Sequence, residues 1–312
     1  MEKQVTNKIT KRILDKIGQP DLLEKLSRLS QSDINSLFLE INKNQTNKLT
    51  PSDILNNYQT NRFVVPSALA PEKFYQLEVD LTTEAKDHGI DSVLLSPVAP
   101  LGSCCVFGCV DQNNVVSATR GCEVLPDTTN MLAIYLADKV STGSVDNKNG
   151  IHICSANRLT RAQAYENAGF FAHFGVFCIV SSGKDKGSYA CEVDLLTKQL
   201  DFYRAMFKSG YKAEMSIVLR KRSGYTDTAG FFNKMLELMK VQLPDVAIST
   251  ADSDIENNYY KGINFKIYMH TKSETIEIGD GGFTDWTQKM LNSKKERCQI
   301  SGISMDRLLL FK

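Results

Sequence analysis

The chain has 312 residues, enough for one large domain or for a domain with a smaller appendage. Hydrophobic residues make up 42% and charged residues 23%, and the net charge of +1 excludes an overall field that recruits nucleic acid or anionic membranes. No apolar run approaches the roughly 20 residues that cross a bilayer. The first residues carry too many charges for a signal peptide, and eight cysteines without such a signal predict reduced thiols in the cytoplasm.

Residues 1–60 show helical patterns separated by short loops. Ile9, Ile13 and Ile17 recur every four residues, and a glycine and a proline at positions 18 and 20 end that helix. Ser32 is expected to cap a second helix, and Pro51 stands at the expected start of a third. We therefore expect a small helical appendage over 1–60 and a main body over 61–312.

The main body begins with a helix over 71–89, followed by short candidate strands at 92–97, 104–110 and 115–119. A helix over 127–140 and strands at 151–159 and 169–180 come next. A helix over 188–207, a strand over 214–222, a helix over 227–240 and paired strands at 262–270 and 274–279 complete the series. Consecutive strands joined by turns, with helices between the hairpins, predict an α+β fold around an antiparallel sheet.

Arginines accompany aromatic residues in the strand region. Arg158 and Arg161 lie on one candidate strand, and Arg307, near the end of the chain, shares a face with apolar residues. Four residues of the following strand alternate onto one face: Phe171, His173, Gly175 and Phe177. Guanidinium groups bind phosphates in a fork geometry, and an aromatic ring can stack on adenine. The alternative is that the rings belong to the core and the arginines form ion pairs.

In this order, the segments resemble the catalytic core of class II aminoacyl-tRNA synthetases over residues 71–312. "NRLTRAQ" followed by "FFAHFGVF" is similar to the second motif of that class, and "GISMDRLLL" to the third. The resemblance implies that Arg158 holds the α-phosphate of ATP, that Phe171 stacks on adenine, and that Arg307 meets the γ-phosphate. His173 and Phe177 also fit the spacing of the stacking position. The resemblance also implies a homodimer whose two chains pair around residues 74–98.

Two further segments are similar to the histidyl branch of the class: "NNYYKGINFKIY" and "IGDGGFTDWTQKML". They imply that Tyr259 and Tyr260 lie at the substrate and that Gly281 and Gly282 let the backbone approach it closely. Glu277 and Asp280 are candidate ligands of Mg²⁺, which prefers oxygen donors.

An ammonium group of the substrate has two further candidate partners, Glu123 and Asp127. Both precede the first long helix of the main body, a stretch that faces the amino acid in the resembled fold. Asp127 has an alternative role as the cap of the helix that begins at Thr128.

The sequence departs from the family pattern at several positions. The glutamate expected two residues after the phosphate arginine is Thr160, and the acidic residue and the glutamine of the histidyl pocket fall at Phe177 and His173. We therefore do not expect histidine as the substrate. No anticodon-binding domain follows Arg307, so we do not expect ordinary tRNA charging.

A zinc site is a further hypothesis, from a similarity to atypical seryl-synthetase-like amino acid:carrier-protein ligases. Cys122 and Cys298 occupy comparable places, and His173 could complete a set of three ligands with an open fourth position. The alternative is that both thiols are buried free cysteines. Cys104, Cys105 and Cys109 are expected to fill a strand.

Three functions remain open from the sequence. The first is an ATP-dependent ligase that activates an amino acid or similar carboxylate as its adenylate, with ATP and Mg²⁺, for a carrier protein, a small amine or a tRNA. The second is a non-catalytic regulatory paralogue of histidyl-tRNA synthetase. The third is an interaction scaffold in which Arg307 pairs with an internal carboxylate.

Overall fold

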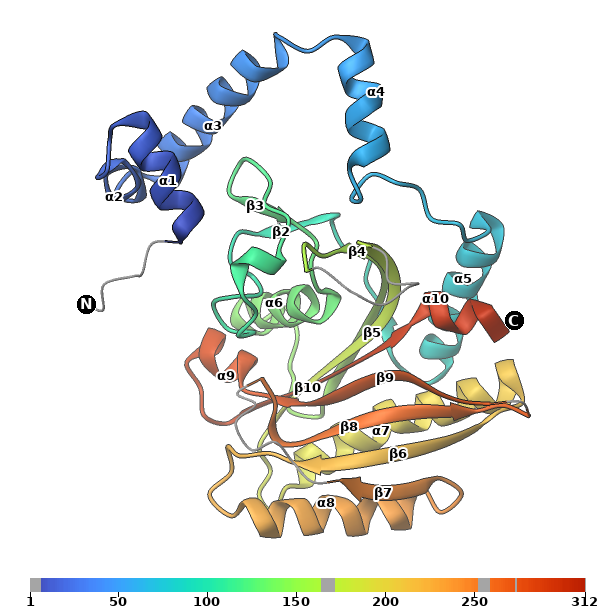
Figure 1. Ribbon diagram of the computed structural model, residues 1–312. Coiled ribbons are helices and arrows are strands. Elements are labelled where there is room, and N and C mark those ends of the chain that lie inside the picture. Colours follow the sequence, from blue (N-terminus) through green and yellow to red (C-terminus); the bar gives the residue numbers. More distant parts are fainter. Residues whose placement is uncertain (1–6, 164–171, 252–258, 273, 312) are drawn as a thin grey trace.

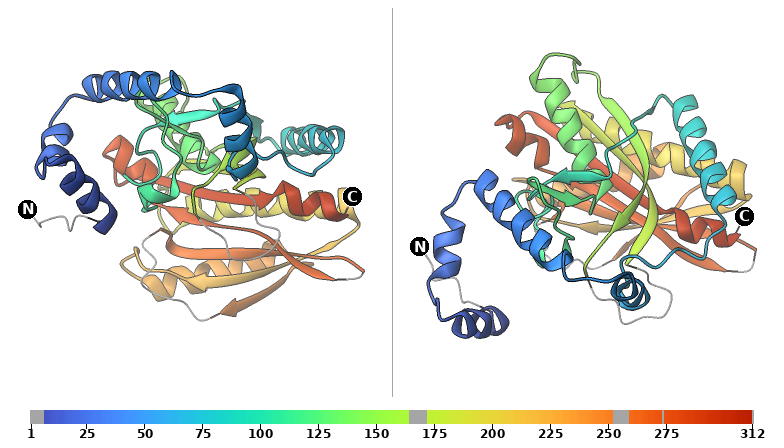
Figure 2. Two further views of the ribbon diagram at one scale, coloured as in Figure 1. Left: turned by 45° about the horizontal axis from the view of Figure 1, so that its top comes forward. Right: turned by 90° about the horizontal axis from the view of Figure 1, so that it is seen from above.

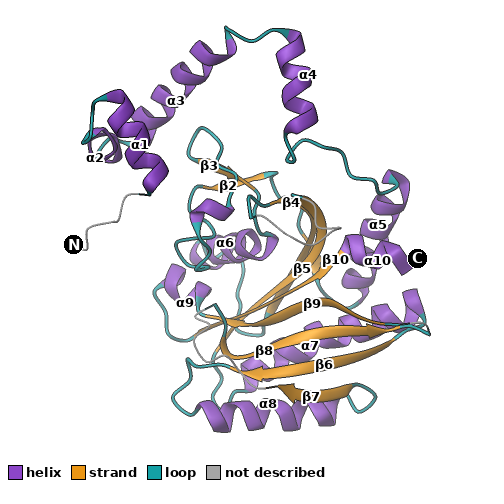
Figure 3. Cartoon of the chain, in the orientation of Figure 1, coloured by secondary structure: helices purple, strands orange, loops and turns teal. Residues whose placement is uncertain are grey.

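The computed structural model describes residues 7–163, 172–251, 259–272 and 274–311. Within these residues the body is built on an eight-stranded sheet in the order β1-β4-β5-β10-β9-β8-β6-β7 (Figure 3). All neighbours pair antiparallel except β1 with β4 and β6 with β7. The strands are β1 (Asp91–Ser92), β4 (Ile151–Thr160), β5 (His173–Lys184), β6 (Glu214–Lys221), β7 (Ala247–Ala251), β8 (Lys261–His270), β9 (Thr275–Thr284) and β10 (Glu296–Ser304).

Helices cover both faces of this sheet (Figure 1). One face carries α7 (Ala190–Met206) and α8 (Thr228–Gln242), and the other carries α6 (Thr128–Ser141) and α9 (Trp286–Leu291). Phe177 and Phe202 stack between β5 and α7, while Trp286 packs with Phe107 and the inner side of α6. The predicted α+β class is confirmed, and the sheet is buried on both sides because helices are inserted between its hairpins.

Helix α5 (Pro71–Asp87) lies along the β1–β4 end of the sheet. Its buried residues Phe74, Leu77 and Leu81 follow helical spacing, so that one stripe faces the core while the opposite side is exposed. The same helix contacts α10 (Met305–Leu308), the short helix that follows β10 and is continued by the turn η3 (Leu309–Phe311). The helix expected over 71–89 is thus confirmed.

Before α5, four helices form an arm along the outside of the body (Figure 2). They are α1 (Lys8–Ile17), α2 (Leu22–Ser27), α3 (Gln31–Thr46) and α4 (Pro51–Thr60), and none of them contains a buried residue. Gly18 ends α1 in a left-handed conformation, as expected, whereas α3 is capped by Ser30 and not by Ser32. The Asn35 side chain accepts hydrogen bonds from the backbone of Arg120 and Gly121, which fixes α3 to the body.

The linker between the arm and α5 passes the end of the β4–β5 hairpin at which β4 ends and β5 begins. The Arg62 guanidinium donates to the carbonyls of Ala162 and Gln163, and the ring of His173 bonds to the carbonyl of Val65 at 2.6 Å. The linker therefore holds the hairpin at the end where Arg161 lies.

The segment 101–119 differs from expectation. Strands were expected at 104–110 and 115–119, but the structure has turns, a 3-10 turn η1 (Gln112–Asn114) and isolated bridges. The segment wraps around the carboxylate of Glu123, which is fully buried and accepts from Gly102 N, Ser103 Oγ and Gln112 Nε2. A buried carboxylate with three donors fixes the path of the backbone more strongly than the apolar alternation could. The short strands β2 (Val98–Pro100) and β3 (Cys122–Val124) pair separately beside it.

Candidate functional site

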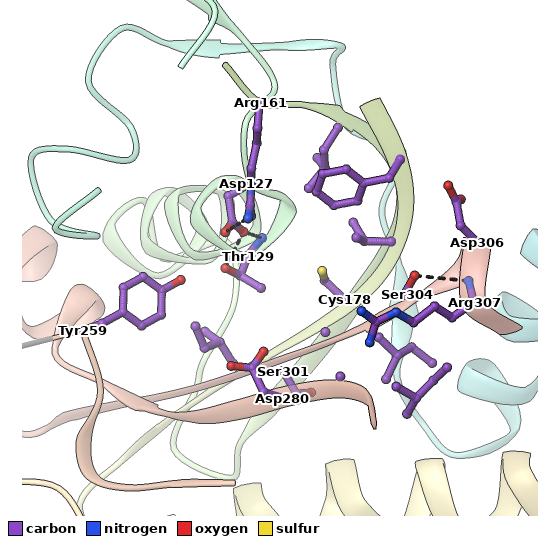
Figure 4. A pocket seen from close by; sticks show the side chains of 18 of the residues that line it. Asp127, Thr129, Arg161, Cys178, Tyr259, Asp280, Ser301, Ser304, Asp306 and Arg307 are labelled. Atoms are coloured by element: carbon purple, nitrogen blue, oxygen red, sulfur yellow. Dashed lines mark hydrogen bonds and ion pairs between the residues drawn. The ribbon is translucent and has the colours of Figure 1, made fainter. Parts of the chain in front are cut away.

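A cavity of about 480 Å³ lies on the α6 side of the sheet (Figure 4). Its floor is formed by the first half of β5, the middle of β9 and the second half of β10. Its walls are formed by the start of α6, the segment at 259–260 and α10. Its volume is within the range of sites for small molecules. The polar and charged residues that line it are Asp127, Thr129, Arg161, Tyr259, Tyr260, Asp280, Ser301, Ser304, Asp306 and Arg307.

Two arginines reach this cavity from distant parts of the chain. Arg161, just after β4, donates from Nε to the carbonyl of Pro126 at 3.1 Å and pairs with Asp127 at 3.3 Å. Arg307, on α10, points into the cavity from the opposite side, and one of its nitrogens donates to the carbonyl of Glu277 (Figure 4). The cavity thus has a cationic group at each of two sides.

Arg158, the arginine to which the resemblance assigns the α-phosphate, does not line the cavity. Its guanidinium lies 5.4 Å from the ring of Phe74 on α5, 2.6 Å from Nδ1 of His173 and 4.0 Å from Asp306. Side chains alternate along a strand, so Leu159 and Arg161 share the cavity face while Arg158 points to the α5 side.

The same alternation reverses the expected face of β5. Phe174, Val176 and Cys178 line the cavity, whereas Phe177 is fully buried on the opposite face against α7. His173 bonds to Arg158 and to the linker, not to the cavity. Phe171 lies outside the described residues. The aromatic ring beside the cavity arginine is that of Phe174, 5.5 Å from the Arg161 guanidinium.

Asp127 and Asp280 also line the cavity. Asp127 caps α6 through Thr129 N at 2.8 Å and also lines the cavity, so both roles expected of it are compatible. Asp280 accepts from the hydroxyl of Tyr260 at 3.1 Å. The Asp280 side chain is accessible from the cavity, but the surrounding walls limit its hydration. This desolvation raises the pKa of Asp280, and repulsion from the Asp127 carboxylate raises it further. An ammonium group would relieve both penalties.

The two tyrosines both line the cavity. The ring of Tyr259 packs edge-on against Trp286 and Tyr260, which orients both hydroxyls from one turn. Gly282 leaves room for this arrangement, since a Cβ there would lie 2.6 Å from the Tyr260 ring. A Cβ at Gly281 would instead meet Phe265 on the other face of the sheet, so Gly281 serves core packing.

A second cavity of about 300 Å³ adjoins the first. The two share Asp127, Arg161, Tyr259, Tyr260 and Asp280 as a common wall. Cys104, Val110, Asn114, Val115, Pro126 and Gln163 complete the second cavity. A ligand with two parts could therefore place one part in each cavity, with the shared wall that includes Asp280 between them.

No protein-family model and no curated protein sequence matches the chain. An ATP phosphoribosyltransferase regulatory subunit/histidyl-tRNA synthetase from Bacillus halodurans matches with a TM-score of 0.60 at 12% identity, over 80% of this chain and 82% of its own. A putative threonyl-tRNA synthetase from Aeropyrum pernix matches with 0.60 at 12%, over 77% and 59%. The apo histidyl-tRNA synthetase of S. aureus matches with 0.57 at 14%, over 79% and 69%.

The body has a class II synthetase-like fold. At these identities the similarity concerns the fold, and the function must be argued from the site itself. In this class II fold the cavity occupies the face of the antiparallel sheet on which the α6 helix begins.

Of the two expected magnesium ligands, only one lines the cavity. Asp280 lines the cavity, but both carboxylate oxygens of Glu277 accept from Lys266 Nζ at 2.8 Å, and one accepts from Tyr268. Burial raises the pKa of Glu277, but the bonds from Lys266 outweigh it and the net shift is downward. Only the carbonyl of Glu277 reaches Arg307.

The predicted zinc set is not assembled. Cys298 pairs with Ser182 across β10 and β5, whereas His173 lies nine residues from Ser182 at the other end of β5. At about 3.3 Å per residue, the two ligands are roughly 30 Å apart. Cys298 is buried beside α9, and the thiol of Cys122 contacts the carbonyl of Arg120. Across the described residues no three metal-binding side chains come together.

Glu123 was expected to bind an ammonium group, but its burial under the 102–112 segment removes it from both cavities. The sequence assigned no site role to Arg161, and it did not single out several other polar or aromatic residues of the cavity, namely Phe174, Thr129, Ser301, Ser304 and Asp306. The sequence did indicate Phe174 indirectly. Side chains alternate along that strand, and Phe174 belongs to the face opposite to the one that was chosen. No helix in the described part of the chain is long and apolar enough to cross a membrane.

Proposed function

We propose that the protein is an ATP-dependent ligase that activates an amino acid or similar amino-bearing carboxylate as its adenylate. The observation that carries this proposal is that Arg161, Arg307 and Asp280 all line one cavity. Arginine suits phosphate oxygens because its fork of donors matches their geometry. A carboxylate whose pKa is raised by desolvation is stabilised by an ammonium partner.

The positions of the charges suggest how the two substrates lie. The triphosphate extends between the guanidinium groups of Arg161 and Arg307, with the ring of Phe174 beside the first of them. The amino group of the acid meets Asp280, and its side chain enters the second cavity. A carboxylate oxygen attacks the α-phosphorus of ATP, the bond from that phosphorus to the bridging oxygen breaks, and pyrophosphate leaves.

The residues contribute to this reaction by positioning and charge neutralisation. Holding the carboxylate close to the phosphorus removes much of the entropic cost of the encounter. Arg161 and Arg307 stabilise negative charge as it shifts toward the leaving group. Mg²⁺ would supply further neutralisation of the phosphates when bound. Of its two predicted ligands, Glu277 is bound by Lys266 and Asp280 is taken by the amino group, so neither is assigned to the ion.

Exchange of labelled pyrophosphate into ATP tests the ligase directly. The full chain is incubated with Mg·ATP and a panel of amino acids, amino-bearing acids and plain carboxylates. Exchange that depends on an amino-bearing acid supports the proposal, and Asp280→Asn is expected to abolish it while Mg·ATP still binds. No exchange with any acid, in a protein that binds Mg·ATP, would refute the ligase.

A second candidate is a regulatory protein that binds an amino acid without catalysis. The contact of Lys266 with Glu277 favours it, because this contact occupies a carboxylate expected to serve the metal. Thr160 in place of the family glutamate points the same way. Calorimetry separates the two functions, because the regulator binds an amino acid and shows no heat with Mg·ATP.

The acceptor of the activated acid also belongs to the proposal. A carrier-protein thiol, a small amine and a tRNA recognised without an anticodon domain are the candidates. Transfer from labelled acid to each acceptor, in the presence of ATP, would identify the productive one. The same cytoplasmic setting suits all three.

A further inference from the structure

A bulge in β9 brings Glu277 to the same face of the sheet as Asp280, which lines the cavity. On β8, Lys266 pairs with Asp280, and Tyr268, the next residue but one, pairs with Glu277. The register shift between these pairs leaves Ile278 of β9 as an extra residue. Residues three apart in a regular strand face opposite sides, so the bulge is what places both carboxylates on the face that carries Lys266.

The Glu277 carboxylate is held by two donors from β8. Both of its oxygens accept from Nζ of Lys266 at 2.8 Å, and one also accepts from the Tyr268 hydroxyl at 3.1 Å. The side chains of Lys266 and Glu277 are 27% and 39% exposed, and ion pairs this accessible to water contribute little to folding stability. Stability alone therefore does not account for this contact beside the cavity.

Arg307 binds the other acceptor of the same residue. The pairing of β9 with β10 ends at Gly279 and Ile303, so the carbonyl of Glu277 lies beyond the ladder and accepts from the Arg307 guanidinium. Burial opposes ionisation of the Glu277 carboxyl, but the bonds and charge of Lys266 lower its pKa, and the charge of Arg307 adds to that lowering. The guanidinium therefore lies within electrostatic reach of the carboxylate as well.

Two anions can compete for Arg307. A guanidinium has five donors, so the bond to the Glu277 carbonyl leaves others for a ligand in the cavity or for the Glu277 carboxylate. A carboxylate on the same chain is present at a high effective concentration, and its bond to a guanidinium is charge-assisted. It would therefore occupy much of the guanidinium unless another group held it. Neither Lys266 nor Glu277 lines the cavity.

We propose that Lys266 is a positioning residue for Arg307: it holds the Glu277 carboxylate, so that the guanidinium stays available to an anionic ligand in the cavity. Lys266 acts through Glu277 and does not touch the ligand. The inference rests on the proposed function only in requiring a phosphate group at Arg307, and it does not require that an adenylate forms.

Calorimetry of the full chain with Mg·ATP tests the proposal. Lys266→Met should weaken binding roughly tenfold or more, because the released Glu277 carboxylate then pairs with Arg307. Adding Glu277→Gln to Lys266→Met should restore the affinity to within about threefold of the native chain, because a neutral amide does not capture the guanidinium. Lys266→Arg keeps a cation on the carboxylate and should bind Mg·ATP as the native chain does.

Lys261→Met is the matched control. This lysine lies on the same strand, is 24% exposed and pairs with a different carboxylate, that of Asp285, at 3.6 Å. Its replacement removes the same charge and should leave Mg·ATP binding unchanged. In a chain that already carries Arg307→Met, Lys266→Met should change the affinity by less than about twofold, because the group it protects is gone. Thermal unfolding checks that every variant is folded.

Inorganic pyrophosphate, titrated in parallel, separates this inference from the ligase. If Mg·ATP binds but Lys266→Met loses no affinity, or Glu277→Gln does not restore the loss, the inference fails and the ligase stands. A loss without restoration would make Lys266 a direct ligand of the phosphates. If pyrophosphate shows the expected pattern in a chain without acid-dependent exchange, the inference holds and the ligase fails. A native chain that binds neither compound overturns both.

Discussion

Two substitutions, Arg161→Met and Arg158→Met, test which arginine binds ATP. The structure favours Arg161, whereas the sequence resemblance implies Arg158. Arg161 lines the cavity, whereas Arg158 points to Phe74 on α5. Losing one charge-assisted hydrogen bond to a phosphate costs about 1.5–3 kcal/mol. At about 1.4 kcal/mol per tenfold, Arg161→Met should weaken Mg·ATP binding roughly 10- to 150-fold. Arg158→Met should change it by less than about threefold, since a side chain outside the cavity removes no contact with the ligand.

Isothermal titration calorimetry of both variants with Mg·ATP provides the measurement, with Arg307→Met as the positive comparison. The side chains of Arg158 and Arg161 are each 34% exposed, so neither substitution should cost more than about 1 kcal/mol of stability. Thermal unfolding of the variants checks this. If Arg158→Met loses ATP and Arg161→Met does not, the cavity is not the nucleotide site and our reasoning fails.

Three further predictions rest on burial and charge. Phe177→Ala should cost about 3–5 kcal/mol in denaturant unfolding, because its ring is fully buried, whereas Phe174→Ala should mainly weaken the ligand. Burial lowers the pKa of His152 to about 4, so the unfolded chain binds the extra proton first, and stability should fall by up to about 3 kcal/mol between pH 6.5 and 4. His152→Gln should flatten that dependence in urea titrations at several pH values. Calorimetry across pH should show amine binding weakening as pH falls through the raised pKa of Asp280, and Asp280→Asn should remove this dependence.

The general architecture was predictable from the sequence because the local signals agreed with the fold. Helix α6 over 128–141 and helix α8 over 228–242 match their expected positions closely. Strands β8 (Lys261–His270) and β6 (Glu214–Lys221) also form within a residue of the expected ranges 262–270 and 214–222. These elements are long and bury a regular face, so their periodicity survives in the folded chain.

The face of each strand at the site could not be predicted in the same way. Helices cover β5 on both sides, so Phe174 and Val176 on one face and Phe177 on the other are all apolar. When both alternating sets are apolar, the pattern does not say which one meets the ligand, and a choice wrong by one residue exchanges the faces. On β4 the same exchange of faces places Leu159 and Arg161 at the cavity and Arg158 away from it.

The prediction for the turn-rich segment at 101–119 was wrong for a different reason. Its apolar residues and cysteines suggested a strand, but the path is set by the buried carboxylate of Glu123, which comes later in the chain. Pairing over such a separation leaves no periodic signal. The same burial keeps Glu123 away from both cavities, although its place before the first long helix of the body suggested a ligand of the substrate.

The contact of the linker with the β4–β5 hairpin bears on where the chain can be shortened. A fragment that begins at residue 71 would leave the carbonyls of Ala162 and Gln163 without the donor that Arg62 provides. It would also free the ring of His173 from Val65. A fragment that begins at residue 61 would keep these bonds. Proteolytic trimming that spares residues 61–70 should therefore retain an ordered end of the β4–β5 hairpin beside Arg161, and trimming beyond them should loosen it.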